Sequence, residues 1–149
     1  MAPPNILVRS EDKVAKLGDL MLAKALDGVL AQQVTRPGEL VGDVNYMSPE
    51  RTRGGAAVDG RSDIYSLGAT VYALLTGRPP FADVSVVETI AKIRKAEPES
   101  PRKYQMSVPS AFEGVVLRLL AKQPAARVQT AEELLKDLER VGRIQGVSV

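Results

Sequence analysis

The chain of 149 residues carries 20 basic and 18 acidic side chains, for a formal charge of +2, and 44% of its residues are hydrophobic. This composition indicates one compact domain with a hydrophobic core, and the small net charge together with an aromatic content of 4% argues against a nucleic-acid-binding surface. Because Cys and His are both absent, the sequence excludes disulfides, thiolate or imidazole metal ligands and a Ser/His/Asp triad within this chain.

Two short extended runs are predicted at the front of the chain. Residues 5–8 and 13–17 are strand-like, and the polar residues 9–12 between them are typical of a turn. A small β-hairpin is therefore expected. Residues 20–40 show no clear periodicity and contain Gly and Pro breakers, which indicates a long loop.

A short helix and a buried helix are predicted next. Ser48 at the N-cap and Pro49 at the first helical position favour a short helix that stops before Gly54. Residues 63–76 then leave almost no polar face, so this second helix is expected inside the protein, with Gly77 as its C-cap. The apolar residues at helical spacing along it are Ile64, Leu67, Val71, Leu74 and Leu75.

Three further helices with one buried face complete the pattern. Residues 84–96 are amphipathic, with an apolar stripe formed by Val86, Val87, Ile90 and Ile93. Two later helices are each announced by a capping box, in which Ser110 precedes Glu113 and Thr130 precedes Glu133. Their stripes consist of Phe112, Val115, Val116, Leu119 and Leu120, and of Ala131, Leu134, Leu135, Leu138 and Val141.

These elements predict a mainly α fold, with helices around a buried central helix and a small hairpin at the N-terminal end. One domain is expected over residues 1–142, followed by a tail over residues 143–149. No apolar stretch is long enough to span a bilayer, and residues 1–9 lack the pattern of a signal peptide. A soluble, cytoplasmic chain without a membrane segment is therefore expected.

The order of these segments resembles the C-terminal lobe of a serine/threonine protein kinase, over about residues 3–141. PPNIL at 3–7 is similar to the end of the family's catalytic loop, and KLGD at 16–19 to the strand leading into its DFG motif. GDVNYMSPE at 42–50 and DIYSLGATVYALLTGRPPF at 63–81 are close to two further family segments. Arg127, in PAARVQTAEEL, matches the arginine before the last helix. Five motifs in the right order and spacing are a specific signal, and they imply a kinase-like C-lobe.

The resemblance implies a magnesium site and an ATP cofactor. In the family, an asparagine amide oxygen and the DFG carboxylate hold magnesium, which bridges the ATP phosphates. Asn5 and Asp19 are the residues that match. On local sequence alone, Asn5 is a turn residue and Asp19 a strand-end cap.

The resemblance also implies structural roles for three charged residues. Glu50 and Arg127 match the family's buried ion pair, for which a planar guanidinium suits a carboxylate. The alternative is two solvated charges. Asp63 matches the carboxylate that accepts hydrogen bonds from the catalytic-loop amides, or it is an ordinary carboxylate at a helix N-terminus.

The activation segment is the third implied region. Thr35 is the only Ser or Thr between Asp19 and Gly42, and it is therefore the one candidate there for a regulatory phosphate. Tyr46 lies in the segment that matches the family's YMAPE run, and Asp43 replaces the family's substrate-positioning threonine.

Several departures from the family pattern bear on activity. Ala2 stands where the family has a loop lysine, and Leu20 and Met21 replace the FG of DFG, so that the hinge loses its glycine. Transfer also needs a Gly-rich loop, a strand lysine, a helix glutamate and a catalytic aspartate. The sequence contains no match to any of these four parts. The chain alone is therefore expected neither to transfer phosphate nor to bind magnesium and ATP.

Two functions therefore remain open. The first is a truncated serine/threonine kinase domain (a fragment, a misplaced start or a degenerate gene) that serves ATP-dependent phosphorylation of proteins when the missing lobe is supplied. The second is a pseudokinase-like interaction module without phosphoryl transfer. An unrelated helical adaptor would require the motif order to be accidental. The partners expected are a substrate or partner protein, a missing N-lobe, or a second copy associating through exposed apolar surface, but not nucleic acid.

Overall fold

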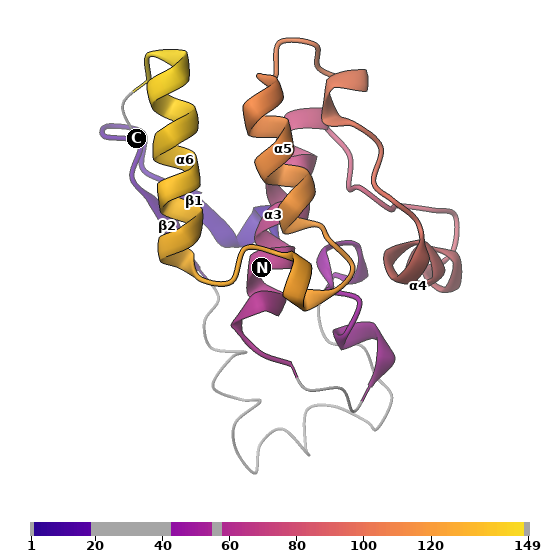
Figure 1. Cartoon of the computed structure of the whole chain (residues 1–149). Helices are drawn as coiled ribbons and strands as arrows, with labels where there is room; N and C mark the ends of the chain where they lie inside the picture. Colours follow the sequence, from indigo (N-terminus) through magenta and orange to yellow (C-terminus); the bar gives the residue numbers. More distant parts are fainter. Residues whose placement is uncertain (1, 19–42, 55–57, 148–149) are drawn as a thin grey trace.

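The computed structural model describes residues 2–18, 43–54 and 58–147, which form a mainly helical structure with one small antiparallel sheet. The elements are β1 (Ile6–Val8), β2 (Ala15–Leu17), α3 (Gly60–Thr76), α4 (Val86–Lys95), α5 (Ser110–Leu119) and α6 (Ala131–Gln145). Figure 1 shows α3 at the centre behind α5, with α6 on one side and α4 set apart on the other. The predicted fold class is confirmed. Within the described residues, no helix combines the length and apolar character needed to cross a membrane.

The predicted hairpin is present, with strands shorter than expected. Ile6 pairs with Leu17 and Val8 with Ala15, in antiparallel register. The turn between the strands is closed by Lys13, whose φ of 59° is unusual for a residue with a side chain. The strands are largely exposed, so the hairpin contributes little to the core of the described structure.

The central helix α3 begins three residues earlier than predicted and ends where predicted. Asp59 caps it by accepting a hydrogen bond of 2.9 Å from the backbone N–H of Arg61. At the other end, Gly77 adopts φ 75°, and its N–H donates to the carbonyl of Ala73 at 2.8 Å. A left-handed glycine at this position is the common helix stop.

Helix α3 is buried on one side only, whereas the near absence of a polar face predicted a helix inside the protein. None of the five stripe residues is buried, and Leu74 is 67% exposed. The buried side instead consists of Ser62, Tyr65, Ser66, Gly68, Ala69, Thr70 and Tyr72. Small residues allow α5 to approach closely, since a Cβ at Gly68 would lie 2.6 Å from the Cβ of Leu119. The buried hydroxyl of Thr70 donates to the carbonyl of Ser66 at 2.8 Å, so its burial leaves no unpaired donor.

The short helix predicted after Ser48 forms only as a 3-10 turn, Arg51–Arg53. The hydroxyl of Ser48 is buried without a hydrogen-bond partner among the described residues, so it does not act as a cap. Thr52 is bound instead through its own hydroxyl, which donates to the carbonyl of Pro49 at 2.7 Å. The short helix does not extend further for a local reason, because a threonine hydroxyl bonded to a nearby backbone carbonyl competes with the hydrogen bonds of a regular helix.

Helix α4 has fewer buried residues than predicted. It begins after Ser85, whose hydroxyl accepts from the N–H of Glu88 at 3.2 Å. Thr89 and Ile93 are its buried residues, whereas Val86 and Val87, which the sequence placed in the buried stripe, are exposed.

The two predicted capping boxes have different outcomes. Thr130 caps α6, accepting from the N–H of Glu133 at 3.1 Å. Ser110 is the first residue of α5 rather than its cap, and Pro109 takes that position without a side-chain bond. The backbone N–H of Glu113, which the Ser110 hydroxyl was expected to accept from, donates instead to the carbonyl of Pro109 at 3.0 Å.

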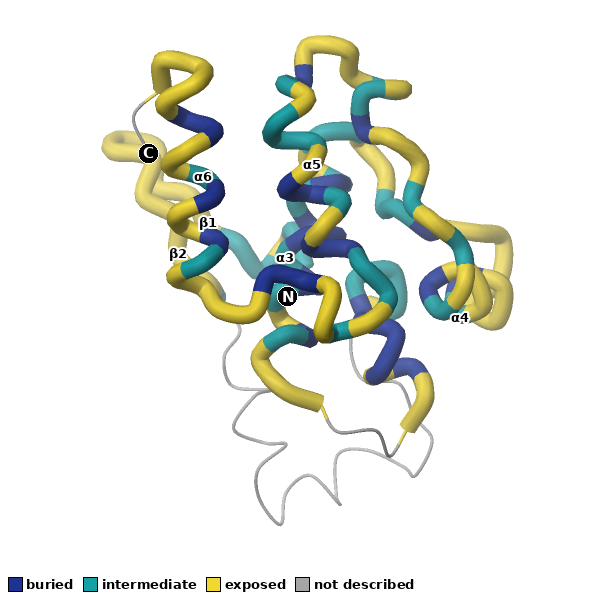
Figure 2. The backbone as a smooth tube through the Cα atoms, in the orientation of Figure 1, coloured by how far each residue is buried: buried dark blue, intermediate teal, exposed yellow. Residues whose placement is uncertain are grey.

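The core lies where α3, α5 and the segments that flank them meet. Figure 2 shows buried positions on these elements, whereas the hairpin and the outer faces of α4 and α6 are exposed. The larger buried clusters contain Tyr65, Ala69, Tyr72, Phe81, Ile93, Val116 and Leu120, and Val115, Leu119, Val128, Leu134 and Val141. Helix α6 continues to Gln145, so three residues that were assigned to the tail are helical.

Candidate functional site

Glu50 and Arg127 form a buried ion pair. Nη1 of Arg127 donates to Oε1 of Glu50 and Nη2 to Oε2, both at 2.7 Å. Arg127 is 1% exposed and Glu50 is 6% exposed. The hydroxyl of Ser62, on α3, donates to the same carboxylate at 2.5 Å. The pair therefore joins the segment before α3, the first turn of α3 and the loop before α6.

The rest of the Arg127 guanidinium is bound by backbone carbonyls. Nε donates to Ala121 at 2.8 Å, Nη1 to Arg61 at 2.9 Å and Nη2 to Lys122 at 3.2 Å. Because all of its nitrogens have partners, this buried charge meets the condition under which a buried ion pair is tolerated.

The environment shifts the ionisation of the groups around the pair. Burial by itself raises the pKa of the Glu50 carboxyl, but hydrogen bonds from Arg127 and Ser62 outweigh it and lower that pKa to about 2. The ring of Tyr65 lies 4.9 Å from the Arg127 guanidinium, and burial raises the pKa of its hydroxyl. Glu50 is therefore ionised at neutral pH and Tyr65 is not.

Of the two residues predicted to hold magnesium, only Asn5 is among the described residues. Its backbone N–H donates to Ala2 at 3.0 Å, and its carbonyl accepts from the N–H of Gly18 at 2.7 Å. The side-chain amide forms no hydrogen bond with the described residues. Asp19 follows Gly18 directly but lies outside the described residues, as do Leu20, Met21 and Thr35.

Asp63 lies in the first turn of α3 and is exposed. Among the described residues it forms no hydrogen bond, although α3 contacts the Pro3–Asn5 turn. Its position fits a carboxylate favoured by the helix dipole. The role implied by the resemblance stays a prediction.

Asp43 and Tyr46 lie at the two ends of a 3-10 turn, Val44–Tyr46. The carboxylate of Asp43 accepts from the backbone N–H of Asn45 at 3.0 Å and from its side-chain amide at 2.8 Å. Burial, and then the negative charge of Asp43, raises the pKa of the half-buried Tyr46. Asp43 therefore has a local structural role as an N-cap.

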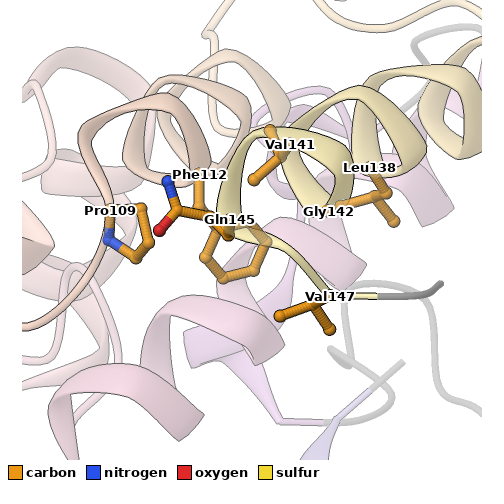
Figure 3. A pocket seen from close by; sticks show the side chains of 7 residues that line it. All are labelled: Pro109, Phe112, Leu138, Val141, Gly142, Gln145 and Val147. Atoms are coloured by element: carbon orange, nitrogen blue, oxygen red, sulfur yellow. The ribbon is translucent and has the colours of Figure 1, made fainter.

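Two apolar grooves run beside α6. One, of about 490 Å³, lies between α5 and the C-terminal half of α6 and is shown in Figure 3. It is lined by Pro109, Phe112, Leu138, Val141, Gly142, Gln145 and Val147. The other, of about 320 Å³, lies between α3 and the start of α6, with Ile64, Leu67 and Leu134 in its wall and Asp63 as its one ionisable residue. Ile64 and Leu67 therefore pack against the core on one side and remain partly exposed in this groove.

Two cations form contacts that the sequence did not predict. Lys122 donates to the carbonyl of Ile93 at 2.9 Å and lies 3.6 Å from the centre of the Phe81 ring, and burial lowers its pKa to about 8. Arg94 donates through Nε to the hydroxyl of Thr52 at 2.9 Å and through Nη2 to its carbonyl. Most of the groups that these two cations contact are backbone carbonyls or an aromatic ring, which carry no charge. The pattern of charges in the sequence therefore could not predict these contacts.

Comparisons with known proteins cover nearly the whole chain. A family model described as the protein kinase domain matches residues 1–138. Serine/threonine-protein kinase PknB of Mycolicibacterium smegmatis is 40% identical over 93% of this chain and 22% of its own length. PrkC of Bacillus subtilis, also a serine/threonine-protein kinase, is 38% identical over 92% of this chain and 20% of its own length. A probable serine/threonine-protein kinase of Corynebacterium efficiens is 39% identical over 95% of this chain. The chain spans about a fifth of the length of these relatives.

Proposed function

This chain belongs to the protein kinase family, and on that premise we propose that it supplies the helical C-terminal lobe for ATP-dependent phosphorylation of serine or threonine in proteins. Taken alone, it is expected to be inactive, because its sequence contains no match to the Gly-rich loop, the strand lysine, the helix glutamate or the catalytic aspartate.

The observation that carries this proposal is the hydrogen bond between Asn5 and Gly18. Through it, the hairpin brings Asn5 opposite the residue that precedes Asp19. An amide oxygen and a carboxylate are the oxygen ligands that magnesium prefers, so these two side chains would hold the ion. When bound, magnesium with ATP supplies neutralisation of the phosphate charge during transfer.

The remaining residues that match the family pattern would have structural, substrate-binding or regulatory roles. Glu50 and Arg127 fix the end of the activation segment against α3 and the loop before α6. Asp63 would support the catalytic loop, and Tyr46 and Asp43 would lie beside the substrate. Thr35 would be the regulatory phosphate acceptor. We expect the protein to act in the cytoplasm.

The apolar grooves suggest where a further segment of a kinase domain would contact this chain. Ile64 and Leu67 on α3 are only partly buried where they line the second groove, which favours cover by another segment of the kinase domain or by a partner chain. Without that cover, we expect the isolated chain to self-associate. Sedimentation analysis of a monodisperse monomer that unfolds cooperatively would contradict this expectation.

A pseudokinase-like interaction module is the second candidate. It is favoured by Asp43, which places a negative charge in the activation segment and is committed there to capping a turn. Leu20 and Met21 in place of the FG of DFG, and Ala2 in place of the loop lysine, favour it as well.

Reading the coding DNA upstream of Met1 in the same frame separates the two candidates. An open frame that encodes the Gly-rich loop, the strand lysine and the catalytic aspartate supports the enzyme. The full protein should then phosphorylate a general protein substrate, and Asn5→Ala should lower the rate by roughly 100-fold or more, since metal positioning supplies much of the catalysis. An in-frame stop close upstream, with no saturable Mg-ATP binding, would leave the interaction module.

A further inference from the structure

Lys122 lies in the segment after α5 and packs against an aromatic ring. Its Nζ lies 3.6 Å from the centre of the buried Phe81 ring and donates to the carbonyl of Ile93 at 2.9 Å. In the part of the chain that the structure describes, Lys122 forms no salt bridge, whereas Lys92 pairs with Asp83 at 2.5 Å. Burial therefore withdraws the amine from water, while no paired carboxylate among these residues holds its proton.

The charges around Lys122 act on its amine in opposite directions. Glu97, just after α4, favours the ammonium, whereas Arg127, which donates to the backbone carbonyl of Lys122 at 3.2 Å, disfavours it. Two other neighbouring carboxylates, Glu50 and Asp83, are each bound by another cation. Burial outweighs the charge of Glu97 and lowers the pKa of the amine to about 8. At pH 7.5 about a quarter of it is then neutral, against about one in a thousand for an ordinary lysine.

The same amine joins α4 to a distant part of the chain. Ile93 belongs to the last turn of α4, whose final carbonyls lack partners within the helix and favour a nearby cation. Among the described residues, the other side-chain hydrogen bonds between α4 and a distant segment are those of Arg94 with Thr52. Loss of the bond from Lys122 would therefore weaken the attachment of this end of α4.

The partly exposed amine of Lys122 has the properties of a nucleophile at neutral pH. A neutral lysine amine attacks electrophiles, and desolvation is one way in which proteins activate it. Part of the Lys122 side chain is exposed, so a small molecule in solution can approach it, although the buried neighbours Phe81 and Ile93 restrict the space for a large one. These conditions favour a compact electrophile such as an acyl phosphate.

We propose that Lys122 is a site of acylation by a small acyl phosphate, and that this modification releases the last turn of α4 from the segment after α5. The amine attacks the carbonyl carbon and an N–C bond forms. The bond from that carbon to the phosphate oxygen breaks, phosphate leaves with the bonding electron pair, and the nitrogen loses a proton to water. The product is a neutral amide, which no longer places a cation at the end of α4 and adds volume beside Phe81.

Acylation can be measured on the full chain with acetyl phosphate as the probe. The readout is the acetylated fraction of each lysine, determined by mass spectrometry after cleavage at glutamates. At pH 7.5 we expect Lys122 to react at least about tenfold faster than Lys136, an exposed lysine of α6. This advantage should shrink as the pH rises toward 10, because exposed lysines in general then gain neutral amine.

The control is the same reaction on the chain unfolded in guanidinium chloride, which removes the burial. Lys122 and Lys136 should then react at rates within about twofold of each other. Equal rates in the folded chain, or a preference for Lys122 that persists after unfolding, would overturn the acylation site.

Release of α4 is tested by hydrogen exchange on Lys122→Gln, which is neutral like an acylated lysine. The amides of α4 should exchange at least about threefold faster, while those of α6 stay unchanged. Lys136→Gln is the matched control and should leave α4 as it is, and Lys122→Arg, which keeps the charge, should restore much of the protection. The chain acetylated at Lys122 provides a second measurement should Lys122→Gln not fold. Unchanged exchange in α4 would overturn the release. Neither experiment depends on kinase activity.

Discussion

The Glu50–Arg127 pair and the β1–β2 hairpin differ in which side chains they bury. In the pair, two charges are buried, and the arginine has five hydrogen bonds to the carboxylate and to carbonyls. In the hairpin, Leu7 is 63% and Leu17 43% exposed, although both are apolar. The region with an implied structural role is thus fully satisfied by contacts within this chain, while the region with the implied metal ligand leaves apolar surface uncovered.

The largest expected effect comes from breaking the ion pair. Arg127→Leu leaves the Glu50 carboxylate buried without its partner, which should lower the free energy of unfolding by roughly 3–5 kcal/mol. Urea denaturation measures the change. A substitution in the hairpin should have a much smaller effect. Leu7→Ser should lower the free energy of unfolding by less than about 0.5 kcal/mol, because the side chain is already exposed. Similar losses in both variants would remove the contrast.

Acid should act on the same pair. The folded pKa of Glu50, about 2, lies below its usual value of 4.5, so its contribution is complete above pH 4.5 and is lost as the pH falls toward 2. The shift corresponds to about 3 kcal/mol. Denaturation midpoints measured across this window should fall steeply for the native sequence. They should fall less for Glu50→Gln, and identical slopes would contradict the lowered pKa.

The close crossing of α3 and α5 gives the next largest effect. Gly68→Ala would place a methyl group 2.6 Å from the Cβ of Leu119, and separating the helices should cost roughly 1–3 kcal/mol. Gly114→Ala is the control, since a Cβ there meets nothing within 4 Å. It should stabilise α5 by about 0.5–1 kcal/mol through helix propensity. Thermal unfolding distinguishes the opposite signs.

The smallest effect concerns the helix caps. Thr130→Ala removes the bond to the N–H of Glu133 and should cost about 1 kcal/mol. Ser110→Ala removes no cap and should change stability by less than about 0.5 kcal/mol. Equal losses in the two unfolding midpoints would mean that Ser110 does cap α5 in solution.

The sequence predicted the positions of helices and strands more reliably than it predicted which side of each helix is buried. The hairpin, the stop at Gly77 and the cap at Thr130 depend on local chemistry and were found where expected. The prediction that α3 lies inside the protein holds for one side only, because the pattern marks apolar residues and cannot reveal that α5 packs closely on the side of Gly68 and leaves Leu74 exposed. The Ser110 cap was wrong because α5 begins one residue earlier than the capping box implies, so that the N–H of Glu113 donates to the carbonyl of Pro109.

The candidate site was predictable only through the resemblance. Glu50 and Arg127 are ordinary charges in a chain with 38 of them, counted as 20 basic and 18 acidic, and no local pattern pairs them. The contacts of Lys122 and Arg94 escaped prediction because their acceptors include backbone carbonyls, which every residue carries.

The separation of 77 positions between Glu50 and Arg127 has a consequence for the order of folding. Helices α5 and α6 can form from neighbouring residues, but this contact must wait until a long loop has closed, which carries an entropic cost. We expect the contact to be absent from the transition state, so that Arg127→Leu chiefly speeds unfolding and leaves the refolding rate almost unchanged. The buried charges would then set the lifetime of the native state more than the speed of reaching it.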